Sequence, residues 1–243
     1  METVTYLSGG LLGDFIHNLS IVNETYLKTG KKGIVYIRNV PVYFRLGVER
    51  AYKDTFPIVS KQPYIHEYKI YNGEPYDINL DRWRESHLLY KASLYEIYKA
   101  TYDVEWATHP WLLCNGLIND TFKDTVFVSC STHRFPLNVD FKELFEQVGF
   151  ERVQFITQTL SEYTGFKERT GIDIPLYLPS SLEDMVGAIQ NCALFIGNMS
   201  SPLTYAYALH KKNITLHNFH TWEGDDVFFK GLDTVLPNIR FNP

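Results

Sequence analysis

Short apolar runs alternate with helical patterns throughout the second half of the chain, and this alternation constrains the fold more than any other feature. The runs of strand type cover residues 126–129, 153–157, 175–178, 193–196 and 214–217. The segments with helical spacing between them cover residues 141–148, 161–170, 182–191 and 202–210. Short connections and strict strand–helix alternation are typical of a parallel sheet covered by helices.

The start of the chain carries the same pattern once. A β-rich run at 3–7 leads into a glycine-rich turn at 8–13, and a second strand is expected at 33–37. Between them, apolar residues follow the 4, 3, 4 spacing of one helix face at Phe15, Leu19, Val22 and Tyr26. Asp14 stands where an N-cap is expected. Further on, a strand at 65–71 and a helix at 88–102 are expected.

These patterns predict an α/β fold with two Rossmann-like lobes whose parallel sheets face a cleft. We expect the first lobe to span residues 1–118 and the second to span 119–243, and the length of 243 residues suits two small domains. Ligands of open parallel sheets bind beyond the carboxyl ends of the strands, and clefts between lobes are favoured pockets. The functional site is therefore expected where the strand–helix loops of both lobes meet.

Charge and hydropathy exclude several classes of protein. The formal net charge is −5 and no run of Lys or Arg reaches four, so nucleic acid is not an expected partner. No apolar run approaches the ~20 residues that cross a bilayer, and no secretion signal is visible. Three scattered cysteines without a CxxC pair suit a reducing compartment. We therefore expect a cytoplasmic protein without a transmembrane segment.

The stretch ALFIGNMSSPLTYAYAL, residues 193–209, places polar side chains where a buried strand gives way to a helix. Pro202 suits the first helical position, which makes Ser201 the expected N-cap. Free amides of the first turn, with the hydroxyls of Ser200, Ser201 and Thr204, would favour an anion. Asn198 ends the preceding strand and joins this candidate site. The alternative is a capped helix that binds nothing.

The N-terminal turn, SGGLLGD, nearly matches the dinucleotide fingerprint GxGxxG, with Ser8 in place of the first glycine, followed by Gly10 and Gly13. The second strand ends in Arg38-Asn39, where NAD binding would require an acidic residue. Asp14 would project at the strand's carboxyl end, either as a general base toward a hydroxyl or as a helix cap. His17, one turn further, would contact a ligand or lie on a solvated helix face; the solvated face is favoured.

Two further clusters follow strands of the second lobe. Arg134 lies in the loop after the strand at 126–129, where it would pair with a phosphate or simply lie on the surface. Polar residues gather after the last strand at His217, His220, Trp222, Glu223, Asp225 and Asp226. Their spacing fits no established metal pattern, so we expect no metal and at most one ligand contact from this loop.

Two stretches carry a resemblance to a known family. SGGLLGDFIHNL, residues 8–19, resembles the start of glycosyltransferases of the GT-B fold, which have two Rossmann-like lobes. SLEDMVGAIQNCALFIGNMSSPLTYAYAL, residues 181–209, is similar to their donor-lobe signature: a helix, a strand ending in Ile-Gly-Asn, and a Ser-Pro helix start rich in alanine. The heptosyltransferase-like group is the most similar. The chain is shorter than usual members, so a trimmed form is expected.

The resemblance implies an inverting, metal-independent transfer of a sugar from a nucleotide sugar to a hydroxyl of a glycan or another acceptor. The donor is a substrate, and no further cofactor is implied. Asp14 would be the base. Ser200, Ser201 and Thr204 would hold the diphosphate, and Arg134 would add positive charge to the leaving group. Gly10, Gly13, His17 and Asn198 complete the expected donor site.

Two alternatives remain open from the sequence. One is a nucleotide-binding or nucleotide-sugar-binding protein on the same fold that has no catalytic activity. The other is an NAD(P)-dependent oxidoreductase that uses the turn at 8–13 for its cofactor.

Overall fold

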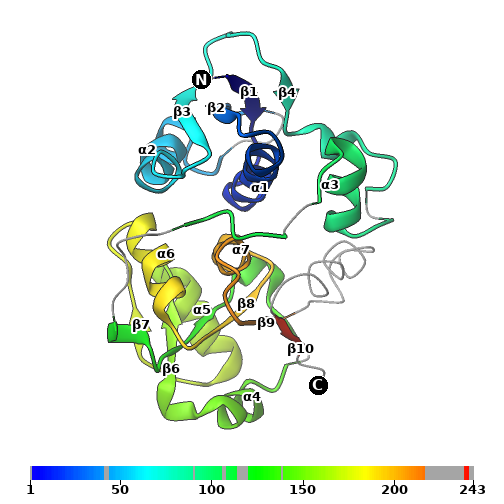
Figure 1. Cartoon of the computed structure of the whole chain (residues 1–243). Coiled ribbons are helices and arrows are strands. Elements are labelled where there is room, and N and C mark those ends of the chain that lie inside the picture. Colours follow the sequence, from blue (N-terminus) through cyan, green and yellow to red (C-terminus); the bar gives the residue numbers. More distant parts are fainter. Residues whose placement is uncertain are drawn as a thin grey trace.

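Two parallel sheets, each flanked by helices, form the structure (Figure 1). The computed structural model describes residues 2–40, 44–89, 91–105, 108–113, 120–137, 139–216 and 238–240. This is the α/β fold with two Rossmann-like lobes that the sequence predicts. The strands of the first sheet fall within residues 1–118 and those of the second within 119–243. The exact boundary stays a prediction, because residues 114–119 lie outside the described residues.

The first sheet has the strand order β3-β2-β1-β4, with every pairing parallel. Its strands are β1 (Thr3–Ser8), β2 (Lys32–Ile37), β3 (Ile65–Ile70) and β4 (Ile78–Asn79). Its helices are α1 (Leu12–Thr29), α2 (Val48–Val59) and α3 (Leu94–Tyr102), with the short 3-10 turn η1 (Arg82–Glu85). The chain therefore reverses its direction of growth between β1 and β4, a topological switch point.

The second sheet has the order β10-β9-β8-β5-β6-β7 and is also parallel. Its strands are β5 (Val126–Ser129), β6 (Val153–Ile156), β7 (Leu176–Tyr177), β8 (Leu194–Asn198), β9 (Asn213–Leu216) and β10 (Asn238–Arg240). Its helices are α4 (Phe141–Val148), α5 (Leu160–Thr170), α6 (Leu182–Asn191) and α7 (Ser201–Ala208), with 3-10 turns η2 (Asp120–Phe122), η3 (Thr132–Arg134) and η4 (Phe150–Arg152). The switch point of this sheet lies between β5 and β8.

Burial of both faces explains why the second lobe is readable from its sequence. Every residue of β5 and β8 is buried, so both strands are almost continuously apolar, as expected for a parallel sheet covered on both sides. The first lobe departs further from the expectation. The helix predicted from residue 88 begins only at Leu94, because Ser93 and Glu96 form a capping box there. Helix α2 was not predicted, and Pro57 inside it is a residue that normally argues against a helix.

The two lobes share one apolar core. One buried cluster includes residues of β1, α1 and α2 together with residues of α6 and α7. Trp111 connects the two sides of this cluster: the indole Nε1 donates to the carbonyl of Ile16 on α1 at 2.8 Å, and the backbone N–H of Trp111 donates to the carbonyl of Ala208 on α7 at 2.9 Å. Helices α1 and α7 are therefore held against each other, as Figure 1 shows.

Candidate functional site

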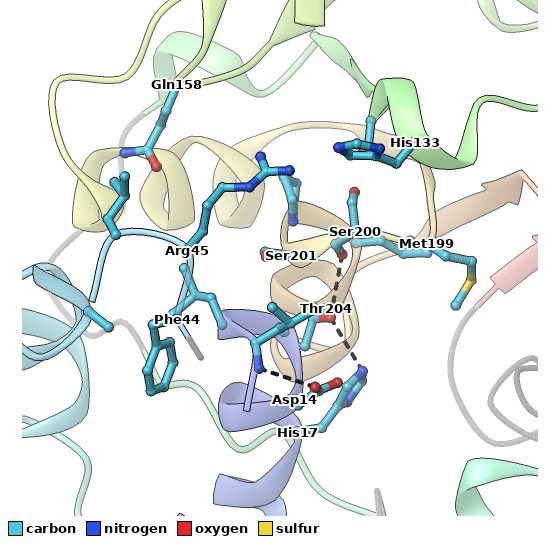
Figure 2. A pocket seen from close by; sticks show the side chains of 18 of the residues that line it. Asp14, His17, Phe44, Arg45, His133, Gln158, Met199, Ser200, Ser201 and Thr204 are labelled. Carbon is cyan, nitrogen blue, oxygen red and sulfur yellow. Dashed lines mark hydrogen bonds between the residues drawn. The ribbon is translucent and has the colours of Figure 1, made fainter. Parts of the chain in front are cut away.

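A pocket of about 510 Å³ lies where the two lobes meet. Five segments form most of its walls: the start of α1, the loop between β2 and α2 with the first part of α2, the loop after β5, the segment from β6 into α5, and the turn from β8 into α7 (Figure 2). All five follow the carboxyl ends of strands, where open parallel sheets bind ligands. The pocket brings together seven residues predicted from the sequence: Gly13, Asp14, His17, Arg134, Ser200, Ser201 and Thr204.

Asp14 does not occupy the N-cap position expected for it. Helix α1 begins at Leu12 with Leu11 as N-cap, and Asp14 is the third helical residue. From there its Oδ2 accepts the backbone N–H of Leu11 at 3.2 Å, the contact that a capping box makes from this position. The helix starts earlier than expected because Gly10, at φ +97°, turns the chain directly after the strand.

A network of ion pairs holds the Asp14 carboxylate in place. Arg84 donates to Asp14 Oδ2 and to Asp81 Oδ1, each at 2.8 Å, and Arg38 donates to Asp81 Oδ2 at 3.2 Å. The backbone N–H of Gly9 also donates to Asp81. Burial raises the pKa of Asp81, whereas the two arginines and this N–H oppose the shift. The network ties the glycine-rich turn to η1.

Sequence reasoning missed this network because Asp81 and Arg84 lie in the polar, irregular segment 72–86. The one available signal was Arg38, a basic residue at the end of the second strand where dinucleotide binding would require an acidic one. In the structure its partner is Asp81 of the same protein rather than a ligand.

The glycines of the turn leave room for neighbouring groups of the protein itself. A Cβ on Gly10 would lie 2.2 Å from an Arg84 nitrogen, and one on Gly9 would lie 2.2 Å from the carbonyl oxygen of Val40. A Cβ on Gly13 would lie 3.1 Å from Thr204 Oγ1, so Gly13 allows the starts of α1 and α7 to approach closely. Gly10 is absent from the described lining of the pocket.

His17 is buried, and the expectation of a solvated helix face is wrong. Its side chain lies against the rings of Trp111 and Tyr207, with Nε2 3.3 Å from Thr204 Oγ1. Burial lowers the pKa of His17 to about 3. The one-sided helical pattern failed here because α7 of the second lobe covers α1 on a side that would otherwise be solvated.

The start of α7 is shifted by one residue from the expectation. Ser200 is the N-cap, Ser201 the first helical residue and Pro202 the second. The Ser200 hydroxyl donates to the carbonyl of Asn198 at 3.1 Å instead of accepting an amide of the first turn. The first amides of a helix have no partner within it, so this end keeps N–H groups available to an anion.

Asn198 and Arg134 hold this turn against the loop after β5. The Asn198 side chain is fully buried, accepts the N–H of Ser131 at 2.9 Å, and donates to the carbonyls of Ser131 and Arg134 at 2.9 and 2.7 Å. Arg134 donates to the carbonyl of Met199 at 3.2 Å and also lines the pocket. Asn198 therefore closes the switch point between β5 and β8 rather than lining the pocket itself.

Several lining residues were not predicted. Arg45 and Arg50 come from the segment after β2, and His133, Gln158 and Glu162 come from the second lobe. The segment after β2 is another strand–helix loop, and that position was the only signal available for its arginines. Arg50 is already paired with Asp54 at 2.7 Å.

No group of three or more His, Cys, Asp or Glu residues that could hold a metal ion occurs among the described residues. The predicted polar loop from His217 to Asp226 lies outside them. Within the same described part, no helix has the length and apolar character needed to span a membrane.

The fold is that of the GT-B glycosyltransferases, as predicted. Among solved structures, a family 9 glycosyltransferase from Veillonella parvula is similar with a TM-score of 0.59 and 12% identity, covering 99% of this chain and 87% of its own. The E. coli heptosyltransferase WaaC, solved with ADP-2-deoxy-2-fluoro heptose, is similar with a TM-score of 0.55 and 10% identity, and the match covers 88% of each chain.

The heptosyltransferase TibC, described as dodecameric and iron-containing and solved with ADP-D-beta-D-heptose, gives a TM-score of 0.62 at 10% identity, covering 100% of this chain and 65% of its own. No protein-family model matches the chain, and no curated protein matches its sequence. At such identities the likeness establishes the fold.

Gly10→Ala should destabilise the protein more than Gly73→Ala. Both glycines have φ +97°, so both variants carry the same backbone strain of roughly 1–2 kcal/mol. Only at Gly10 does the new methyl meet Arg84; nothing lies within 4 Å of a Cβ at Gly73. We expect an additional loss of about 1–3 kcal/mol in the free energy of unfolding, measured by urea denaturation. Equal losses in the two variants would contradict the contact with Arg84.

The free energy of unfolding should fall as the pH drops below about 6.5, in part because of His17. The unfolded chain takes up the proton near pH 6.5 and the folded protein only near pH 3, so protonation favours unfolding between these values. Between pH 7 and 5 the wild type should lose about 2 kcal/mol relative to His17→Gln. Denaturation at both pH values measures this, with exposed His66→Gln as the control. A pH-independent difference between wild type and His17→Gln would refute it.

Proposed function

We propose that this protein is a glycosyltransferase that transfers a sugar from a nucleotide sugar to an acceptor hydroxyl, with inversion and without a metal. One observation carries the proposal. Asp14, on the first lobe, and the Ser200–Ser201 helix start, on the second, line the same pocket of about 510 Å³. A base and an anion site on facing walls are what this transfer requires.

The second-lobe wall suits the donor's diphosphate. The N-terminus of α7 presents backbone amides and the positive end of the helix dipole, and the hydroxyls of Ser200 and Ser201 lie beside it. Arg134 adds a cation from the neighbouring loop. When the glycosidic bond breaks, negative charge develops on the departing diphosphate, and these groups would stabilise it in place of a metal.

The first-lobe wall suits the acceptor. Both described hydrogen bonds to Asp14 fall on Oδ2, and no described residue donates to Oδ1. The carboxylate would take the proton from the acceptor hydroxyl while that oxygen attacks the anomeric carbon and the bond to the diphosphate breaks. Attack from the side opposite the leaving group inverts the anomeric centre. Arg84 would serve by holding the carboxylate in this orientation.

We place the reaction in the cytoplasm. Cys130 and Cys192 are free thiols buried in the core, which suits a reducing compartment. The acceptor is a glycan or another molecule with a hydroxyl group. The oxidoreductase alternative receives less support, because Val40 and Arg84 occupy the space beside Gly9 and Gly10 that a dinucleotide backbone would need.

Asp14→Asn should abolish transfer while nucleotide binding is retained. Loss of a positioned base costs about 10²–10⁴ in rate, whereas the diphosphate would lie on the opposite wall. The measurement is turnover of a panel of ADP-, UDP- and GDP-sugars, with affinity for the diphosphates determined by calorimetry. Asp54→Asn is the matched control, since Asp54 lines the pocket but is paired with Arg50.

If the wild type binds a nucleotide diphosphate but turns over no sugar nucleotide, with glycan acceptors or with water, the protein is the non-catalytic binding protein of the first alternative. Binding of NADPH without binding of any diphosphate would instead favour the oxidoreductase.

Ser200→Ala combined with Ser201→Ala should weaken diphosphate binding more than it lowers stability. Each hydroxyl contributes about 0.5–1.5 kcal/mol as a hydrogen-bond donor, so we expect about a tenfold weaker affinity. The free energy of unfolding should change by less than about 1 kcal/mol, because the Ser200 hydroxyl caps no amide. Calorimetry and urea denaturation measure the two effects. A larger effect on stability than on binding would support the cap-only interpretation.

A further inference from the structure

Basic side chains line the pocket at His17, Arg45, Arg50, His133 and Arg134. Two of the arginines already make contacts within the protein, although Arg134 keeps its charge, and one histidine is uncharged. Arg50 pairs with Asp54 at 2.7 Å, and Arg134 donates to the carbonyl of Met199 at 3.2 Å. His17 is uncharged at neutral pH, since burial lowers its pKa to about 3.

Arg45 differs from these. It is exposed, and it makes no ion pair or hydrogen bond with any described residue. It belongs to the first lobe, on the loop that leads from β2 to α2, whereas His133 and Arg134 belong to the second. In Figure 2 its side chain reaches into the space between Gln158 and Ser201, on the second-lobe side of the pocket.

The acidic side chains of the pocket have partners of their own. Arg84 holds Asp14 at 2.8 Å and Arg50 holds Asp54 at 2.7 Å, while Glu162 accepts the hydroxyl of Thr157 at 2.8 Å. None of these carboxylates contacts Arg45, so its guanidinium keeps its N–H donors available on the side of the pocket where α7 begins. A guanidinium offers a planar fork of donors that matches two phosphate oxygens at once.

We propose that Arg45 is the first lobe's contact to the donor's diphosphate, which would then be held between the Arg45 guanidinium and the start of α7. This inference rests on the proposed function and extends it: the leaving group touches both lobes. As the glycosidic bond breaks, the guanidinium would stabilise the charge that develops on the diphosphate. Bound diphosphate would also tie the loop before α2 to the second lobe.

The test is calorimetric titration of the full chain with inorganic pyrophosphate, ADP, UDP and GDP. Pyrophosphate reports on the phosphate contacts without any base. Arg45→Gln should weaken binding of pyrophosphate, and of each diphosphate that the wild type binds, by about tenfold, the lower range for a hydrogen bond to a charged group. Arg45→Lys should restore part of the affinity, because it keeps the charge but loses the fork. Arg50→Gln, five residues away, should stay within twofold of the wild type.

The outcomes separate the two levels of the argument. Unchanged diphosphate affinity in Arg45→Gln would overturn the inference and leave the diphosphate site standing. An equal loss in Arg50→Gln would also overturn it, because the effect would then be one of general charge. Failure of the wild type to bind pyrophosphate or any diphosphate would overturn the proposed function together with the inference. Because Arg45 is exposed, its variants should unfold at the wild-type temperature without ligand, which checks that a lost affinity is not lost folding.

Discussion

The close contact between α1 and α7 is the constraint on which the site depends. Gly13 has no side chain to keep the helices apart, and Thr204 fills the space that a Cβ would need. His17 lies beside Thr204 between two aromatic rings, and Trp111 bonds to both helices. The starts of the two helices therefore open onto one pocket, which sets the Asp14 carboxylate and the N-terminus of α7 on facing walls.

Each lobe contributes its part of the pocket through the same physical rule. In both sheets the strand order reverses beside the first strand of the lobe, and the loops at that point diverge and leave room for a ligand. Charged or amide side chains connect the loops of each lobe by hydrogen bonds. Asp81 and its arginines do so in the first lobe, and Asn198 does so in the second. Asp81 and Asn198 are buried and hydrogen-bonded within the protein, so they shape the pocket without lining it.

Prediction from the sequence succeeded where burial leaves a strong pattern. The second lobe follows its expected order of strands and helices because its central strands are covered on both faces and read as apolar runs. Prediction from the sequence was weaker in the first lobe, where α2 contains a proline, β4 is only two residues long, and η1 lies in a polar segment. Helix starts were displaced by one to three residues at Asp14 and Ser201, since the N-cap position depends on turn geometry that residue types alone do not specify.

The sequence by itself determined the fold class and seven of the residues that line the pocket, because strand–helix alternation and the polar residues at strand ends are local signals. Tertiary structure decided the state of each side chain. His17 became buried and neutral because a helix from the other lobe covers it. Arg84 came to hold Asp14 across 70 positions of sequence. Among the described residues, Arg45 has no hydrogen-bond or ion-pair partner, while Arg50 pairs with Asp54 and Arg134 donates to Met199. Such pairings arise between segments distant in the chain, so no local pattern can encode them.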